Sequence, residues 1–101
     1  MTNKEKANLN NANKQRHKEL LQELHTTYVA KNADYGSSFS ETFDKLGVIS
    51  AATRILDKTN RFTNLAISKD TKVNDESITD TLMDLANYCL LTVMEIENSK
   101  K

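Results

Sequence analysis

The sequence contains no proline and only two glycines, Gly36 and Gly47, among its 101 residues. Proline and glycine are the residues that most often end helices and form turns, so long helices are permitted everywhere except near these two glycines. Both glycines lie between segments in which apolar residues recur with helical spacing, and no alternating strand pattern extends over a useful length. The sequence therefore predicts an all-α protein.

Apolar residues spaced three and four apart predict three long helices, at residues 14–33, 48–67 and 75–98. Asn74 or Asp75 is a suitable N-cap for the last of them, because short polar side chains accept hydrogen bonds from the first free amides of a helix. Short connections between helices favour antiparallel neighbours. We therefore expect an antiparallel bundle of three main helices.

Between the first two long helices, the sequence predicts a turn and a short helical piece. Asn, Asp, Gly and Ser residues concentrate in residues 32–39, as is typical of turns. Ser40 then fits the N-cap of a short helix over residues 41–46, and Gly47 fits its end.

We expect one domain, at residues 14–98, preceded by a polar segment at residues 1–13 that is frayed or extends the first helix. A chain of this length buries only a modest core. The bundle is therefore expected to be completed by oligomerisation.

Charge and composition exclude several classes of partner. Lys and Arg number 14, and Asp and Glu also number 14, which argues against a nucleic-acid backbone or an anionic membrane as partner. No segment approaches the roughly 20 apolar residues that cross a bilayer, and the N-terminus lacks the apolar core of a signal peptide.

The single cysteine, Cys89, lies in an apolar run and is expected to be a buried small side chain. A cytoplasmic protein is the natural expectation.

Three carboxylates repeat every four residues on the last predicted helix. Glu76, Asp80 and Asp84 therefore share one face, and Asn87 continues it. The row either points into water or holds a divalent cation, since Mg²⁺ favours oxygen ligands. Apolar residues follow on the same face: Leu90, Leu91 and Met94. That continuation predicts that another element or chain covers this half of the helix, which favours the floor of a cleft.

Three basic residues share an arc of the preceding long helix. Arg54, Lys58 and Arg61 are either a solvated edge, paired in part with Asp57, or a phosphate clamp, because guanidinium groups match phosphate oxygens bidentately. Acidic and basic rows can also pair with each other as an interhelical salt-bridge network. The sequence has no glycine-rich phosphate loop, no Cys or His metal cluster and no Ser-His-Asp set. Any catalysis would therefore use carboxylates, a metal ion and water.

Two segments resemble a known family. KNADYGSSF at residues 31–39 and NDESITDTLMDLANY at residues 74–88 are similar to the nucleotide modification associated domain 1 family. That family is common in phages and resembles the all-α NTP pyrophosphatases, the MazG-like and dimeric dUTPase group. The resemblance extends over about residues 19–97.

The resemblance implies a helical bundle that assembles as a dimer or larger homo-oligomer and binds a nucleotide or nucleoside phosphate. It implies Glu76 and Asp80 as ligands of Mg²⁺, and it implies that Asn87 and Tyr88 lie where the base or sugar rests. If the protein is an enzyme, we expect Asp84 to be a third ligand or the base that orients water, and the three basic residues to contact phosphates.

One departure from the pyrophosphatases bears on catalysis. Those enzymes carry a paired ExxE motif on the preceding helix, where this chain has its basic row instead; Glu19 and Glu23 are the available substitutes. Three functions follow as hypotheses: Mg²⁺-dependent hydrolysis of a nucleotide phosphoanhydride, non-catalytic sequestration of a signalling nucleotide, and a structural helical adaptor. Whether the protein is an enzyme stays open at this point.

Overall fold

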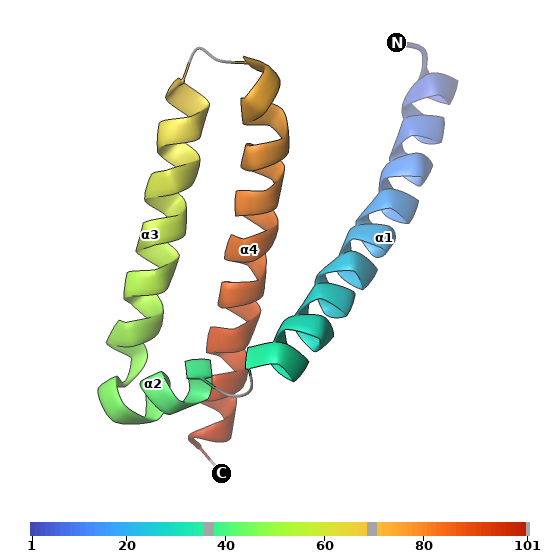
Figure 1. Ribbon diagram of the computed structural model, residues 1–101. Coiled ribbons are helices and arrows are strands. Elements are labelled where there is room, and N and C mark those ends of the chain that lie inside the picture. Colours follow the sequence, from blue (N-terminus) through green and yellow to red (C-terminus); the bar gives the residue numbers. More distant parts are fainter. Residues whose placement is uncertain (36–37, 69–70, 101) are drawn as a thin grey trace. The chain divides into compact units, whose positions relative to one another are not determined.

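The computed structural model describes the whole chain except residues 36–37, 69–70 and 101, and it describes side chains outside residues 33–37, 69–75 and 101. The described residues form four α-helices and contain no strand, which confirms the all-α prediction (Figure 1). The helices are α1 (Asn3–Tyr35), α2 (Ser38–Leu46), α3 (Val48–Ile67) and α4 (Thr71–Asn98). The chain divides into two compact units, residues 1–34 and 35–101.

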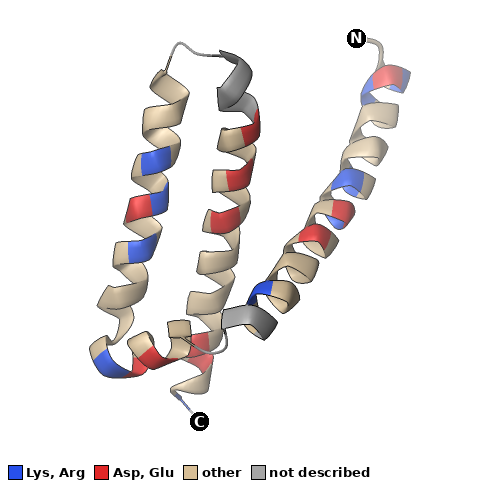
Figure 2. Ribbon diagram, viewed as in Figure 1, with Lys and Arg blue, Asp and Glu red and all other residues tan. Residues whose placement is uncertain are grey.

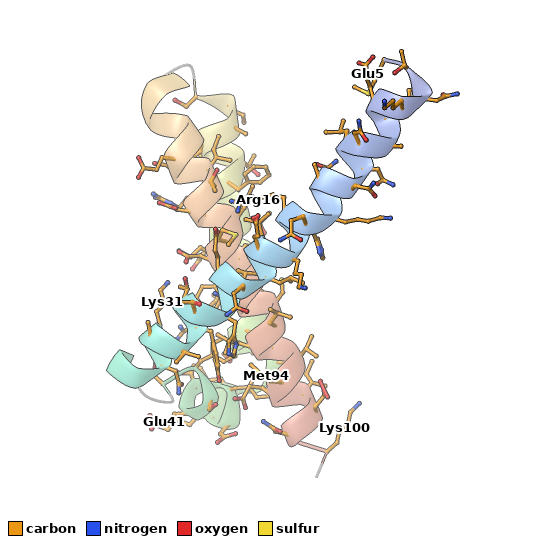
Figure 3. All side chains as sticks on the ribbon, turned by 90° about the vertical axis from the view of Figure 1, so that its right-hand side faces the viewer. Glu5, Arg16, Lys31, Glu41, Met94 and Lys100 are labelled. Atoms are coloured by element: carbon orange, nitrogen blue, oxygen red, sulfur yellow. The ribbon has the colours of Figure 1, made fainter. Side chains whose placement is uncertain are left out.

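Helix α1 starts eleven residues before the expected position, because its first turn is capped. The amide of Glu5 donates to the Thr2 hydroxyl oxygen at 3.1 Å, and that hydroxyl donates to the Glu5 carboxylate at 3.0 Å. The sequence TNKE is therefore a variant of the capping box, in which an N-cap residue and the third helical residue bond each other. Farther along, Arg16 pairs with Glu19 at 4.0 Å and with Glu23 at 3.3 Å; Figure 3 shows Glu5 and Arg16 along this helix.

Helices α3 and α4 lie side by side and run in opposite directions, and α2 lies at the end where α3 begins (Figure 1). The bounds of α3 match the predicted helix at residues 48–67. Helix α4 begins at Thr71, so Asn74 and Asp75 lie inside it and the prediction that either is its N-cap is wrong. The side chains of residues 71–75 lie outside the described part of the chain.

Helix α2 also begins earlier than expected, at Ser38, so the prediction of Ser40 as its N-cap is wrong. The hydroxyl of Ser40 instead bonds the Glu95 carboxylate on α4, which ties α2 to that helix. Of the turn predicted over residues 32–39, positions 36–37 lie outside the described residues, and the remainder belongs to α1 and α2.

Gly47 ends α2 as predicted. Its φ of 75° and ψ of −164° define a backbone conformation that residues with a Cβ rarely adopt. Its amide donates to the carbonyl of Phe43 at 2.7 Å, and its own carbonyl accepts from the amide of Ser50 at 3.1 Å. One residue therefore closes α2 and opens α3.

The core of the unit formed by residues 35–101 is small. Within its described part, Phe43 and Ala51 are the buried apolar residues, and Thr81 is the buried polar residue at 3% exposure. The helical spacing of apolar residues predicts a buried seam on α4, formed by Ile78, Leu82, Leu85, Cys89, Val93 and Ile96. This prediction is wrong in part, because Leu82 is 40% exposed, Val93 is 52% exposed and Cys89 is exposed. Apolar residues surround the C-terminal half of α4, so their spacing could not identify which side contacts α3. Half-buried members of the predicted seam are Ile78, Leu85 and Ile96.

Candidate functional site

The three basic residues of α3 each contact a group on α4. Along α3, Lys58 follows Arg54 by four residues and Arg61 follows Lys58 by three. Their partners on α4 are separated by the same numbers of residues in the opposite direction along the chain, as expected for antiparallel helices. Figure 2 shows the basic segments of α3 beside the acidic segments of α4. The pairs are Arg54 with Tyr88, Lys58 with Asp84, and Arg61 with Thr81.

Lys58 and Asp84 form an ion pair between the two rows. Nζ of Lys58 lies 3.4 Å from Oδ2 of Asp84, and the two side chains are 28% and 32% exposed. The acidic and basic rows therefore meet within one chain at this point. A pair with this much exposure contributes about 0–1 kcal/mol to the free energy of unfolding, since water screens it.

Arg61 is held through its Nε atom, which donates to the Thr81 hydroxyl at 3.2 Å. That hydroxyl in turn donates to the carbonyl of Ser77 at 2.7 Å, so the buried oxygen of Thr81 is bonded in both roles. Because only Nε is used in this contact and Arg61 is exposed, the Nη groups keep donors for an anion. A guanidinium fixed by one nitrogen presents the others in a defined plane.

The guanidinium of Arg54 contacts two aromatic rings that also contact each other. The central carbon of its guanidinium is 5.6 Å from the centre of the Phe39 ring and 5.9 Å from that of Tyr88, and the two ring centres are 6.0 Å apart. Cation–π contacts use the flat face of the guanidinium and leave its N–H edge for hydrogen bonds. Phe39 thus brings α2 to the same end of the row.

The remaining carboxylates of the acidic row are more open. Glu76 and Asp80 are exposed, whereas Asn87 and Tyr88 are half-buried. In the part of the chain that the structure describes, no three His, Cys, Asp or Glu residues lie close enough together to hold a metal ion. Two carboxylates on successive turns are nevertheless compatible with Mg²⁺, which often binds one or two carboxylates, waters and substrate phosphates.

Sequence reasoning found the two charged rows but missed Thr81, Phe39 and the Ser40–Glu95 contact. A signal for Thr81 was present, since polar residues at positions 77, 81, 84 and 88 share one side of α4 at helical spacing. Phe39 carried no such signal, because its contact with Arg54 and Tyr88 joins distant parts of the sequence. Glu19 and Glu23 belong to the other compact unit and pair there with Arg16.

A family model described as nucleotide modification associated domain 1 matches residues 31–96, well over half of the chain. No curated protein and no solved structure matches it significantly. None of the helices in the described ranges combines the length and the apolar character needed to span a membrane.

Proposed function

The chain belongs to the nucleotide modification associated domain 1 family, and on that premise we propose that it binds a nucleotide or nucleoside phosphate on the charged face of the α3–α4 hairpin. We define the charged face by the basic residues of α3 and the acidic residues of α4: Arg54, Lys58, Arg61, Glu76, Asp80 and Asp84. The observation that carries the proposal is the anchoring of all three basic groups by partners on α4 or α2.

Anchoring favours phosphate binding, because a fixed guanidinium loses little conformational entropy when an anion arrives. Arg61 retains its Nη donors and Arg54 retains its N–H edge, so both can offer a fork to phosphate oxygens. Lys58 offers a point charge that an incoming phosphate would share with Asp84. Phosphate binding therefore needs a shift in one ion pair and no change in the helices.

The base or sugar has candidate contacts at the Tyr88 end of the row. The phenol ring offers an aromatic surface, and the adjacent amide of Asn87 offers a donor and an acceptor. Arg54 lies beside that ring, so a base stacked there would meet a guanidinium as well. The phosphates would then extend toward Lys58 and Arg61.

Hydrolysis is a second candidate, favoured by the exposure of Glu76 and Asp80 on successive turns of α4. These two carboxylates would hold Mg²⁺, with Asp84 as a third ligand or a group that orients water. Bound Mg²⁺ would polarise phosphate oxygens and favour deprotonation of water. Asp84 already contacts Lys58, so this role requires the ion pair to open. Without turnover, the same face would support sequestration of a signalling nucleotide.

A thermal-shift screen of common and modified nucleotides, with and without Mg²⁺, tests the proposal. A ligand specific for the folded chain at one hundred times its Kd adds about 2.7 kcal/mol to the free energy of unfolding and raises Tm accordingly. Release of phosphate or pyrophosphate with Mg²⁺ supports hydrolysis, whereas stoichiometric binding without turnover supports sequestration. If no nucleotide raises Tm, the structural adaptor is the better account. The homo-oligomer remains a prediction in all three cases.

A further inference from the structure

The first turn of α2 contacts α4 through two consecutive residues. The centre of the Phe39 ring lies 6.0 Å from that of the Tyr88 ring, and the hydroxyl of the next residue, Ser40, donates to the carboxylate of Glu95. Tyr88 and Glu95 are seven residues apart, so they lie about two turns apart on the same side of α4. All four side chains are half-buried. Figure 1 shows α2 beside the C-terminal half of α4.

The position of Phe39 depends on how α2 is held. Helix α2 joins α3 through the single residue Gly47, and Phe39 lies eight residues before it, near the other end of α2. That separation is about 12 Å along the helix axis, so a rotation of about 10° at Gly47 would move Phe39 by roughly 2 Å. The Phe39 ring centre is 5.6 Å from the central guanidinium carbon of Arg54, and cation–π contacts extend to about 6 Å. A small rotation of α2 is therefore enough to break this contact.

Core packing restrains α2 mainly near its junction with α3. Phe43 is buried, but it lies four residues from Gly47 and so acts on the middle of α2. Ser40 lies three residues farther from the junction, next to Phe39. A hydroxyl that donates to a carboxylate makes a charge-assisted hydrogen bond, which is stronger than a bond between neutral groups and depends on direction. The bond between Ser40 and Glu95 therefore restrains the end of α2 that carries Phe39.

We infer that Ser40 and Glu95 are positioning residues whose hydrogen bond holds Phe39 against the guanidinium of Arg54. Neither residue belongs to the charged face or to the proposed contacts with base and sugar. The contact between Phe39 and Arg54 is present in the chain without a ligand. The effect on ligand binding rests on the proposed function, because Arg54 is one of the three residues proposed to contact phosphates.

Phe39 limits the directions that the guanidinium of Arg54 can take. With Tyr88 alone, Arg54 would have one neighbouring ring; with Phe39 it has two, which also contact each other. A side chain that is already restrained loses less conformational entropy when it binds an anion. Loss of the bond between Ser40 and Glu95 should therefore lower nucleotide affinity, although neither side chain would touch the nucleotide.

Nuclear Overhauser spectroscopy on the full chain without ligand tests the contact itself. Cross-peaks between the Phe39 ring and the Arg54 side chain are expected in the wild type. They should be lost or strongly weakened in Ser40→Ala and in Glu95→Ala. Glu95→Gln keeps a side-chain oxygen that can accept from the hydroxyl, so this variant should keep the cross-peaks.

Two matched controls separate the positioning role from general effects on the helices. Thr42→Val removes another hydroxyl of α2, one that bonds within the helix to the carbonyl of Ser38 at 3.0 Å. Glu97→Ala removes an exposed carboxylate of α4 two residues after Glu95. Both variants should keep the cross-peaks between Phe39 and Arg54.

Titration calorimetry with ATP, GTP, CTP and UTP tests the consequence for binding. For each nucleotide that binds the wild type, Ser40→Ala should weaken affinity about threefold, because one of the two ring contacts of Arg54 is lost. In an Arg54→Lys background, Ser40→Ala should cause no further loss, because Ser40 acts through Arg54. A general structural role of Ser40 would instead weaken binding equally in both backgrounds.

Cross-peaks that survive in both Ser40→Ala and Glu95→Ala overturn the inference, as does an equal loss of affinity in the two backgrounds. If Ser40→Ala fails to fold by circular dichroism, the comparison of Glu95→Ala with Glu95→Gln decides. If none of the four nucleotides binds the wild type, the proposed function loses support, and the cross-peaks still decide whether Ser40 and Glu95 position Phe39.

Discussion

Nζ of Lys58 on α3 lies 3.4 Å from Oδ2 of Asp84 on α4. This contact joins the basic and acidic rows inside one chain. It also places a carboxylate beside the cation that a phosphate would use, so Asp84 competes with an incoming anion for Lys58.

Asp84→Asn removes the negative charge and keeps the shape of the side chain. The free energy of unfolding should fall by no more than about 1 kcal/mol, since the pair is partly exposed. Mg²⁺-independent nucleotide binding should tighten several-fold, because Lys58 is released and a repulsive charge is removed. Titration calorimetry without Mg²⁺ measures this. Weaker binding in Asp84→Asn would contradict a phosphate at Lys58.

If the protein hydrolyses nucleotides, the same variant should lose turnover while it gains affinity, because Asp84 is the candidate third ligand or base. Phosphate release with Mg²⁺ distinguishes the two functions. A variant with unchanged turnover would remove Asp84 from the mechanism.

Arg54→Lys tests whether the guanidinium matters beyond its charge. A lysine keeps the charge but loses the planar fork beside Phe39 and Tyr88, so nucleotide affinity should fall about tenfold, as expected for a loss of about 1.4 kcal/mol. Arg16→Lys on α1 makes the same change at an exposed ion-paired position and should leave affinity unchanged. Equal nucleotide affinities for the two variants would exclude a role for the Arg54 guanidinium beyond its charge.

Substitution of Gly47 should lower the free energy of unfolding because of the backbone conformation at this position. No atom lies within 4 Å of a Cβ built at this position, so the cost comes from the backbone conformation alone, with a φ of 75° and a ψ of −164°. Essentially only glycine adopts this region, so Gly47→Val and Gly47→Asn should each lower the free energy of unfolding by about 1–3 kcal/mol. Denaturant titration measures the loss. An asparagine variant as stable as the wild type would contradict the assigned conformation.

Thr2→Ala should loosen the start of α1. Loss of the two contacts with Glu5 costs about 1 kcal/mol of local helix stability. Amide hydrogen exchange should accelerate in the first turns of α1 and stay unchanged in α3. Thr26→Ala removes a mid-helix hydroxyl bonded to the carbonyl of Gln22 and serves as the control. Unchanged exchange near Asn3 would show that the cap contributes nothing.

The fold was predictable where local rules decide it. The all-α class follows from the absence of proline and from the helical spacing of apolar residues. The end of α2 at Gly47 and the bounds of α3 also follow from short-range sequence signals. The helix starts were less predictable. The cap at Thr2 lay in a polar segment without an apolar stripe, and Ser40 resembles a cap but bonds Glu95 on a distant helix.

The site was predictable in its residue types and less so in its contacts. Spacing identified the two charged rows, but register between α3 and α4 decides that Lys58 meets Asp84 and that Arg61 meets Thr81. Single-helix periodicity cannot supply that register. The exposure of Cys89 also escaped prediction, because apolar residues surround that half of α4 and leave its orientation undetermined.

Calorimetric titration of the best nucleotide from the screen into the wild type, Arg61→Gln and Lys45→Gln tests the central claim most directly. Lys45 is an exposed basic residue on α2, outside the charged face, so its variant removes the same charge elsewhere. Nucleotide binding on the charged face predicts that Arg61→Gln weakens affinity at least tenfold, about 1.4 kcal/mol, and that Lys45→Gln matches the wild type. Equal binding by all three proteins, or no binding by the wild type, would contradict it.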